Sequence, residues 1–121
     1  MMRSIRDYDV FKLSHRLAVT VYKVTNVFPK TEVFGLISQT RRSAYSIPMN
    51  LVEGAARRSP KEFARFVDIA IGSCEEVRYQ LYLACELDFI GPEPYQQLES
   101  AYEKVKMMLS RLLDRVESGQ R

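Results

Sequence analysis

Residues 59–87 read SPKEFARFVDIAIGSCEEVRYQLYLACEL and are typical of one long helix. Ser59 can accept a hydrogen bond from the amide of Glu62 while the Glu62 carboxylate reaches back, and Pro60 suits the first helical position. Apolar side chains then recur at intervals of three and four residues, and a second apolar set widens the stripe. We therefore predict a helix over about residues 60–87 that is buried on more than one side.

Three further segments show the same periodicity, and we predict helices over about residues 10–28, 36–57 and 94–117. Pro29 stops the first, whereas Pro48 lies inside the second and is expected to bend it rather than divide it. No segment alternates as a strand does. Four helices joined by short turns predict an all-α protein, an antiparallel up-and-down four-helix bundle in which residues 1–121 form one domain.

Charge is divided unevenly along the chain, whose net charge is only +3. Counting Lys and Arg against Asp and Glu gives +4 for residues 1–30, +3 for 31–66, −6 for 67–99 and +2 for 100–121. Such blocks can be solvated faces of a monomer, but they also suit a ring in which oppositely charged faces of neighbouring copies meet. The extra apolar stripes on the second and third predicted helices favour a homo-oligomer.

The residue inventory argues against several classes of protein. Cys74 and Cys85 lie about 16 Å apart along one predicted helix, too far for a disulfide. With His15 as the one histidine, the chain cannot build the usual Cys/His zinc site. There is no phosphate-binding glycine loop or nucleophile elbow. We therefore expect no enzyme activity, no metal and no cofactor. The apolar runs are also short of the roughly 20 residues that span a bilayer, which predicts a soluble, cytoplasmic protein without membrane contact.

Small and polar residues form a second stripe on the helix predicted at 36–57, and the helix predicted at 60–87 offers a matching patch. Two hypotheses fit them. They can satisfy buried polar groups and fix the helix register, or a carboxylate among them can act as a general base. We favour the first and assign the set to packing and assembly: Ser46, Pro48, Asn50, Glu53, Gly54, Gly72, Ser73 and Glu76.

Basic side chains gather where the second and third predicted helices meet. Such a cluster can contact nucleic-acid phosphates, with Tyr and Phe available for stacking, although a charge run is often a solvated face. The candidate nucleic-acid-binding residues are Arg41, Arg42, Arg57, Arg58, Lys61 and Arg65.

Five short motifs follow one another along the chain. They are FPKxE at 28–32, QxRRSA at 39–44, SIPxNxxEG at 46–54, FxxF at 63–66 and GSxxE at 72–76. Together, over about residues 9–115, they resemble the four-helix-bundle family of 23S rRNA-intervening-sequence proteins. Members are small bacterial proteins, some encoded within large-subunit ribosomal RNA genes. A related branch comprises the accessory variability proteins of diversity-generating retroelements, which bind nucleic acid and work with a reverse transcriptase.

The resemblance implies a homopentameric ring with a positively charged surface, and a reverse transcriptase as a possible partner. It places Arg41, Arg42, Asn50 and Glu53 in the motif of the second helix. Two hypotheses of function follow. The first is a nucleic-acid-binding homo-oligomer, in which arginines repeated around a ring multiply weak phosphate contacts. The alternative is a protein–protein scaffold without nucleic-acid binding.

Overall fold

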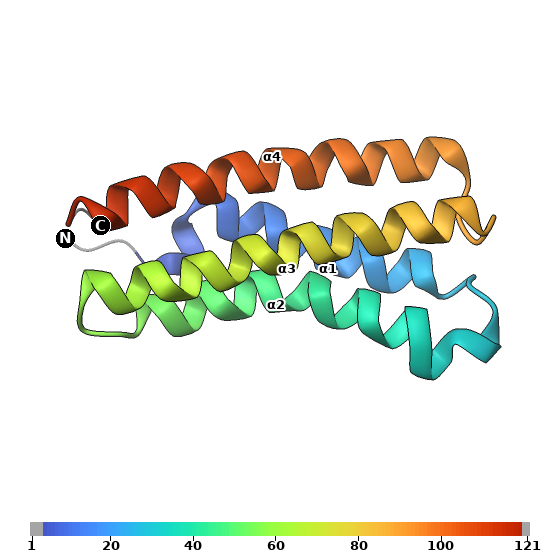
Figure 1. Ribbon diagram of the computed structural model, residues 1–121, viewed down its shortest axis with the longest axis horizontal. Helices are drawn as coiled ribbons and strands as arrows, with labels where there is room; N and C mark the ends of the chain where they lie inside the picture. Colours follow the sequence, from blue (N-terminus) through green and yellow to red (C-terminus); the bar gives the residue numbers. More distant parts are fainter. Residues whose placement is uncertain (1–3, 120–121) are drawn as a thin grey trace.

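The structure, a computed structural model, describes residues 4–119. Its four long helices are α1 (Asp9–Thr25), α2 (Ser38–Ala55), α3 (Pro60–Glu86) and α4 (Pro92–Glu117). Short helical turns occupy Ile5–Asp7 (η1), Lys30–Glu32 (η2) and Val33–Ile37 (η3). Successive helices run in opposite directions (Figure 1), and the described residues contain no strand. The prediction of an all-α protein with four helices is confirmed.

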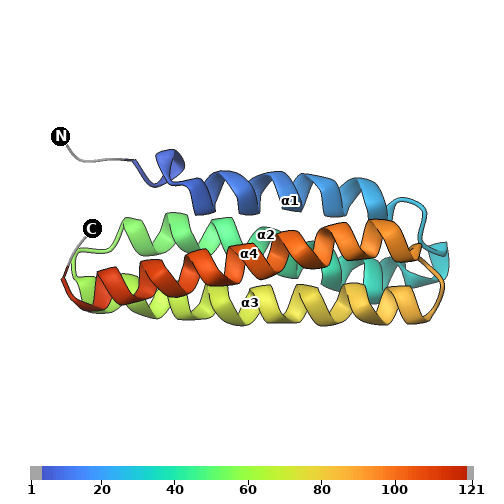
Figure 2. The same ribbon diagram turned by 90° about the horizontal axis from the view of Figure 1, so that it is seen from above.

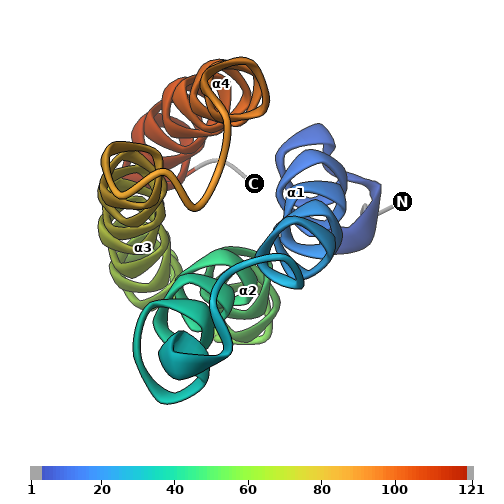
Figure 3. The same ribbon diagram turned by 90° about the vertical axis from the view of Figure 1, so that its right-hand side faces the viewer.

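The helices lie in an arc in chain order when the bundle is viewed along its length (Figure 3). α2 packs extensively on α3, and α4 contacts α3 more than it contacts α1. The core between them is continuous, and the large side chains without solvent exposure include Ile47, Leu51, Leu81, Tyr102 and Leu109. No helix in residues 4–119 is both long and apolar enough to cross a membrane.

The end of α1 and the beginning of α2 differ from their predicted positions. α1 ends at Thr25, three residues early, and the chain then turns before Pro29. α2 is preceded by the η3 turn, where the Glu32 carboxylate accepts a hydrogen bond from the amide of Leu36 at 3.2 Å. α2 itself continues through the buried Pro48 as one helix and is bowed along its length (Figure 1).

Ser59 begins α3 as predicted, because its hydroxyl accepts a hydrogen bond from the amide of Glu62 at 3.1 Å. Pro60 occupies the first turn. The Glu62 carboxylate lies 3.6 Å from Arg65 Nε, toward the helix rather than back toward Ser59. The start of α3 therefore rests on the hydroxyl cap and on the proline.

α2 and α3 approach each other closely where Gly54 faces two phenylalanines. A Cβ at this position would lie 2.8 Å from Phe66 Cβ and 2.9 Å from Phe63 Cδ1, closer than real side chains tolerate. Farther along the same seam, the hydroxyls of Ser46 and Ser73 are hydrogen-bonded at 2.9 Å. Small residues thus set the separation of the two helices.

We predict that Gly54→Ala destabilises the protein by about 1–3 kcal/mol, because the added methyl overpacks the α2–α3 seam. Ser100→Ala is the control, because Ser100 lies at an exposed position of α4 away from this seam. In the control, replacing a helical serine by alanine should keep or slightly raise stability, by up to about 0.5 kcal/mol. Urea unfolding at equal subunit concentration measures both, and equal stabilities of the two variants would contradict this account of the seam.

Candidate nucleic-acid interface

One end of the bundle carries a basic surface, which we call the basic end and define as Arg57, Arg58, Lys61 and Arg65. α2 ends at Ala55 and α3 begins at Pro60, so Arg57 and Arg58 lie in one short connection (Figure 2). Lys61 and Arg65 follow in the first turns of α3. All four side chains are exposed. The cations are near one another because the turn is short and because Ser59 starts the next helix at once.

Phe66 holds two of these cations in place. Its ring is buried, and the guanidinium carbons of Arg57 and Arg65 lie 5.0 and 5.1 Å from the ring centroid. Arg57 also pairs with Glu53 at 3.5 Å, and Arg65 pairs with Glu62 at 3.6 Å. These exposed ion pairs are weak, so the two arginines are oriented by the ring as much as by the carboxylates.

The other two cations of the basic end, Arg58 and Lys61, form no ion pair with any carboxylate in residues 4–119. Two of the four cations of the basic end are therefore not neutralised by an ion pair among the described residues and can meet phosphates.

Arg41 and Arg42 lie elsewhere, near the opposite end of the bundle. Along α2, Arg42 and Arg57 are separated by about 22 Å at 1.5 Å per residue. The six predicted residues are therefore two groups and not one surface.

Arg41 has a structural task at the end of α1. It donates to Thr25 Oγ1 at 2.8 Å, to the carbonyl of Tyr22 at 3.2 Å and to Asn26 Oδ1 at 3.0 Å. Its guanidinium carbon also lies 4.7 Å from the centroid of the Tyr22 ring. A cation at the carboxyl end of a helix satisfies carbonyls and complements the dipole, so Arg41 fastens α1 to α2.

The structure brings together part of the predicted packing set. Asn50 Nδ2 donates to the carbonyl and to the hydroxyl of Ser46, at 2.7 and 2.9 Å, while Ser46 and Ser73 bond across the seam. Glu53 and Glu76 instead are exposed, and Glu53 is paired with Arg57. The carboxylates thus lack the burial that would favour a general base at this position.

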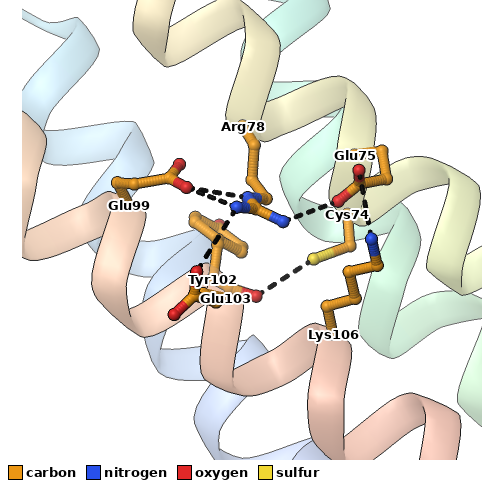
Figure 4. Close-up of polar contacts among 7 residues, drawn as sticks. All are labelled: Cys74, Glu75, Arg78, Glu99, Tyr102, Glu103 and Lys106. Carbon is orange, nitrogen blue, oxygen red and sulfur yellow. Dashed lines mark hydrogen bonds and ion pairs between the residues drawn. The ribbon is translucent and has the colours of Figure 1, made fainter.

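An ion network between α3 and α4 was not anticipated (Figure 4). Arg78 donates through Nε to Glu99 at 3.0 Å and through a terminal nitrogen to Glu75 at 2.8 Å. Lys106 lies 3.4 Å from Glu75, and Glu103 lies 3.9 Å from Arg78. The hydrogen bond to Glu99 is the main cause that raises the pKa of Arg78. The only signal in the sequence was a lone basic residue within the acidic block of residues 67–99.

Two potentially nucleophilic groups lie beside this network but are inactivated by burial. Cys74 is buried and donates to the carbonyl of Tyr102 at 3.3 Å. Burial, with a smaller contribution from Glu75, raises the pKa of Cys74 to about 12. Burial also raises the pKa of Tyr102. Both groups therefore stay protonated at neutral pH. Within residues 4–119, no three His, Cys, Asp or Glu side chains are placed to hold a metal ion.

The comparisons with known proteins agree with this fold. The sequence profile of the family described as 23S rRNA-intervening sequence protein matches residues 6–111. The chain belongs to this family. A crystal structure of a protein with unknown function from the S23 ribosomal protein family of Bacteroides thetaiotaomicron VPI-5482 superimposes with a TM-score of 0.79 at 23% identity. That match covers 87% of this chain and 95% of the other. It shows a shared fold. No curated protein matches the sequence.

We predict that Arg78→Met destabilises this family member by about 1–3 kcal/mol, because the half-buried Glu99 loses its charged hydrogen-bond donor. Glu103→Gln is the control, since its exposed carboxylate lies 3.9 Å from Arg78 and should contribute at most about 0.5 kcal/mol. Thermal or urea unfolding compares the two. Similar losses in both variants would show that the network acts through general charge rather than through the Glu99 contact.

Proposed function

We propose that the protein is a non-enzymatic homo-oligomer that binds the phosphate backbone of RNA or DNA through its basic end. The observation that supports this most directly is the set of four exposed cations, two of which have no carboxylate partner in residues 4–119. Each cation that meets a phosphate releases counterions, and this release dominates nucleic-acid affinity. Several copies in one assembly would raise the avidity of an individually weak surface.

Exposed apolar side chains on α2 and α3 support the homo-oligomer. Met49 and Val52 on α2 and Ile69 on α3 are each between 41% and 47% exposed. Gly72, one turn after Ile69, is an exposed glycine in the middle of a helix, with open space where a side chain would be. Such a glycine costs about 1 kcal/mol relative to alanine, and close approach of another chain would account for it. The number five, a reverse transcriptase partner and a cytoplasmic location belong to the proposal through the family resemblance.

One observation favours the alternative, a scaffold that binds protein. Lys61 and Arg65 line a cavity of about 650 Å³ together with Glu62, Asp68 and Glu117. Carboxylates therefore stand beside two of the four cations. An acidic protein segment, including residues 67–99 of a second copy, could neutralise the remaining charge instead of nucleic acid.

Charge reversal at the unpaired cations tests the nucleic-acid proposal. The double variant Arg58→Glu/Lys61→Glu should bind a fluorescent structured RNA at least about tenfold more weakly, with a salt slope reduced by about 0.7–0.9 for each phosphate that the variant no longer neutralises. Anisotropy across a salt series measures both quantities. Arg57 is a poorer choice, because its contacts with Phe66 and Glu53 make it part of the structure.

The control carries the same change of charge elsewhere, as Lys12→Glu/Lys104→Glu on the exposed faces of α1 and α4. It should weaken RNA binding much less. If both double variants bind as the unaltered protein does, or if that protein does not bind RNA at low salt, the scaffold becomes the better hypothesis.

A second substitution tests the homo-oligomer. Gly72→Gln adds a helix-compatible side chain at an exposed position where a Cβ meets nothing within 4 Å among the described residues, so the fold should be retained. If α3 packs against another copy at this position, the assembly mass measured by light scattering should fall to that of smaller species. Ser100→Gln, at an exposed position of α4, is the control and should leave the mass unchanged. An unchanged mass in Gly72→Gln would place the interface elsewhere.

A further inference from the structure

A cavity of about 440 Å³ lies where the last turns of α1 meet the beginning of α2. The end of α1 and the beginning of α2 lie at the end of the bundle opposite the α2–α3 connection (Figure 2). The lining residues of the cavity include two tyrosines, Tyr22 and Tyr45, two arginines, Arg41 and Arg42, and Gln39. The volume falls within the range of small-molecule pockets and is large enough for one nucleotide.

The aromatic walls of this cavity are accessible and one of them is fixed. Tyr22 is 43% exposed and Tyr45 is 38% exposed, so each can offer part of its ring to a ligand. The bonds from Arg41 to Thr25 and Asn26 hold its guanidinium over the Tyr22 ring. The wall on the α1 side is thus in place before any ligand arrives, which reduces the entropy lost on binding.

The charge of the cavity favours an anion. Its lining contains two arginines and no carboxylate, whereas three other cavities of the bundle each have at least one Asp or Glu in their lining. The nearby Glu32 carboxylate is engaged by the amide of Leu36. Arg42 is exposed and forms no ion pair within residues 4–119, so its charge is available to a phosphate.

We propose that this cavity binds an unpaired nucleotide of a single-stranded nucleic acid, with the base against Tyr22 and Tyr45 and the phosphate on Arg42. Aromatic side chains beside cations are how proteins bind single strands, because every unpaired base has a face to stack. A duplex keeps its base faces covered by their neighbours and offers only phosphates. The cavity would therefore select single strands, while the basic end would accept phosphates of either form. This inference rests on the proposed function only in taking nucleic acid as the ligand.

The test compares three fluorescent probes of about 12 nucleotides: a single strand of uridines, the same strand with abasic residues, and a duplex. Tyr45→Leu removes the ring but keeps an apolar side chain at a partly exposed position, so the fold should be retained. It should bind the uridine strand about 5- to 100-fold more weakly and bind the duplex as the unaltered protein does. Tyr45→Phe keeps the ring and should restore binding. Tyr79→Leu, on the exposed face of α3, is the matched control and should change nothing.

The outcomes separate the two proposals. Equal binding of the uridine and abasic strands, or no effect of Tyr45→Leu, overturns the cavity proposal. If binding in that case still depends on Arg58 and Lys61, the proposal for the basic end stands. Base-dependent binding of the single strand that depends on Tyr45, without any duplex binding, supports the cavity and overturns the basic end. Absence of binding to all three probes overturns both.

Discussion

The bundle depends on how closely α2 and α3 can approach each other. Gly54 lies against Phe63 and Phe66, and no larger residue fits there without moving the aromatic rings. Farther along, the Ser46–Ser73 hydrogen bond keeps the same short separation, and Asn50 holds the Ser46 hydroxyl in place. Because Phe66 also orients Arg57 and Arg65, the packing that closes the seam positions the candidate interface as well.

The sequence predicts those features whose causes are local. Burial every three or four residues identifies four helices, and Ser59 with Pro60 marks the start of α3 because both act within one turn. The basic end is predictable for the same reason, since its four cations flank one turn. The hydrogen bond from Arg41 to Thr25 is not predictable in this way, because the two residues are sixteen positions apart and meet only when α1 and α2 pack. Arg78 finds Glu99 across twenty-one positions in the same way.

Two glycines, Gly54 in the α2–α3 seam and Gly72 at an exposed position of α3, lead to opposite conclusions. A contact within the chain accounts for the glycine at position 54, because Phe63 and Phe66 of α3 occupy the space that a side chain would need. Gly72 has open space where a Cβ would lie and is one turn from the exposed Ile69, so no neighbour among residues 4–119 accounts for a residue that weakens its helix. The proposed contact with a second copy would supply the missing cause.

Such a contact would be compatible with ligand binding, because the positions of the three features differ. Ile69 and Gly72 lie in the middle part of α3, whereas the basic end and the cavity beside Tyr45 lie toward opposite ends of the bundle. The acidic block of residues 67–99 includes this middle part of α3 and continues through the α3–α4 turn, and in an assembly it would attract cations of a neighbouring copy. Assembly through the middle of α3 therefore leaves both basic regions open to solvent. An assembly of this kind would present each of them once per copy.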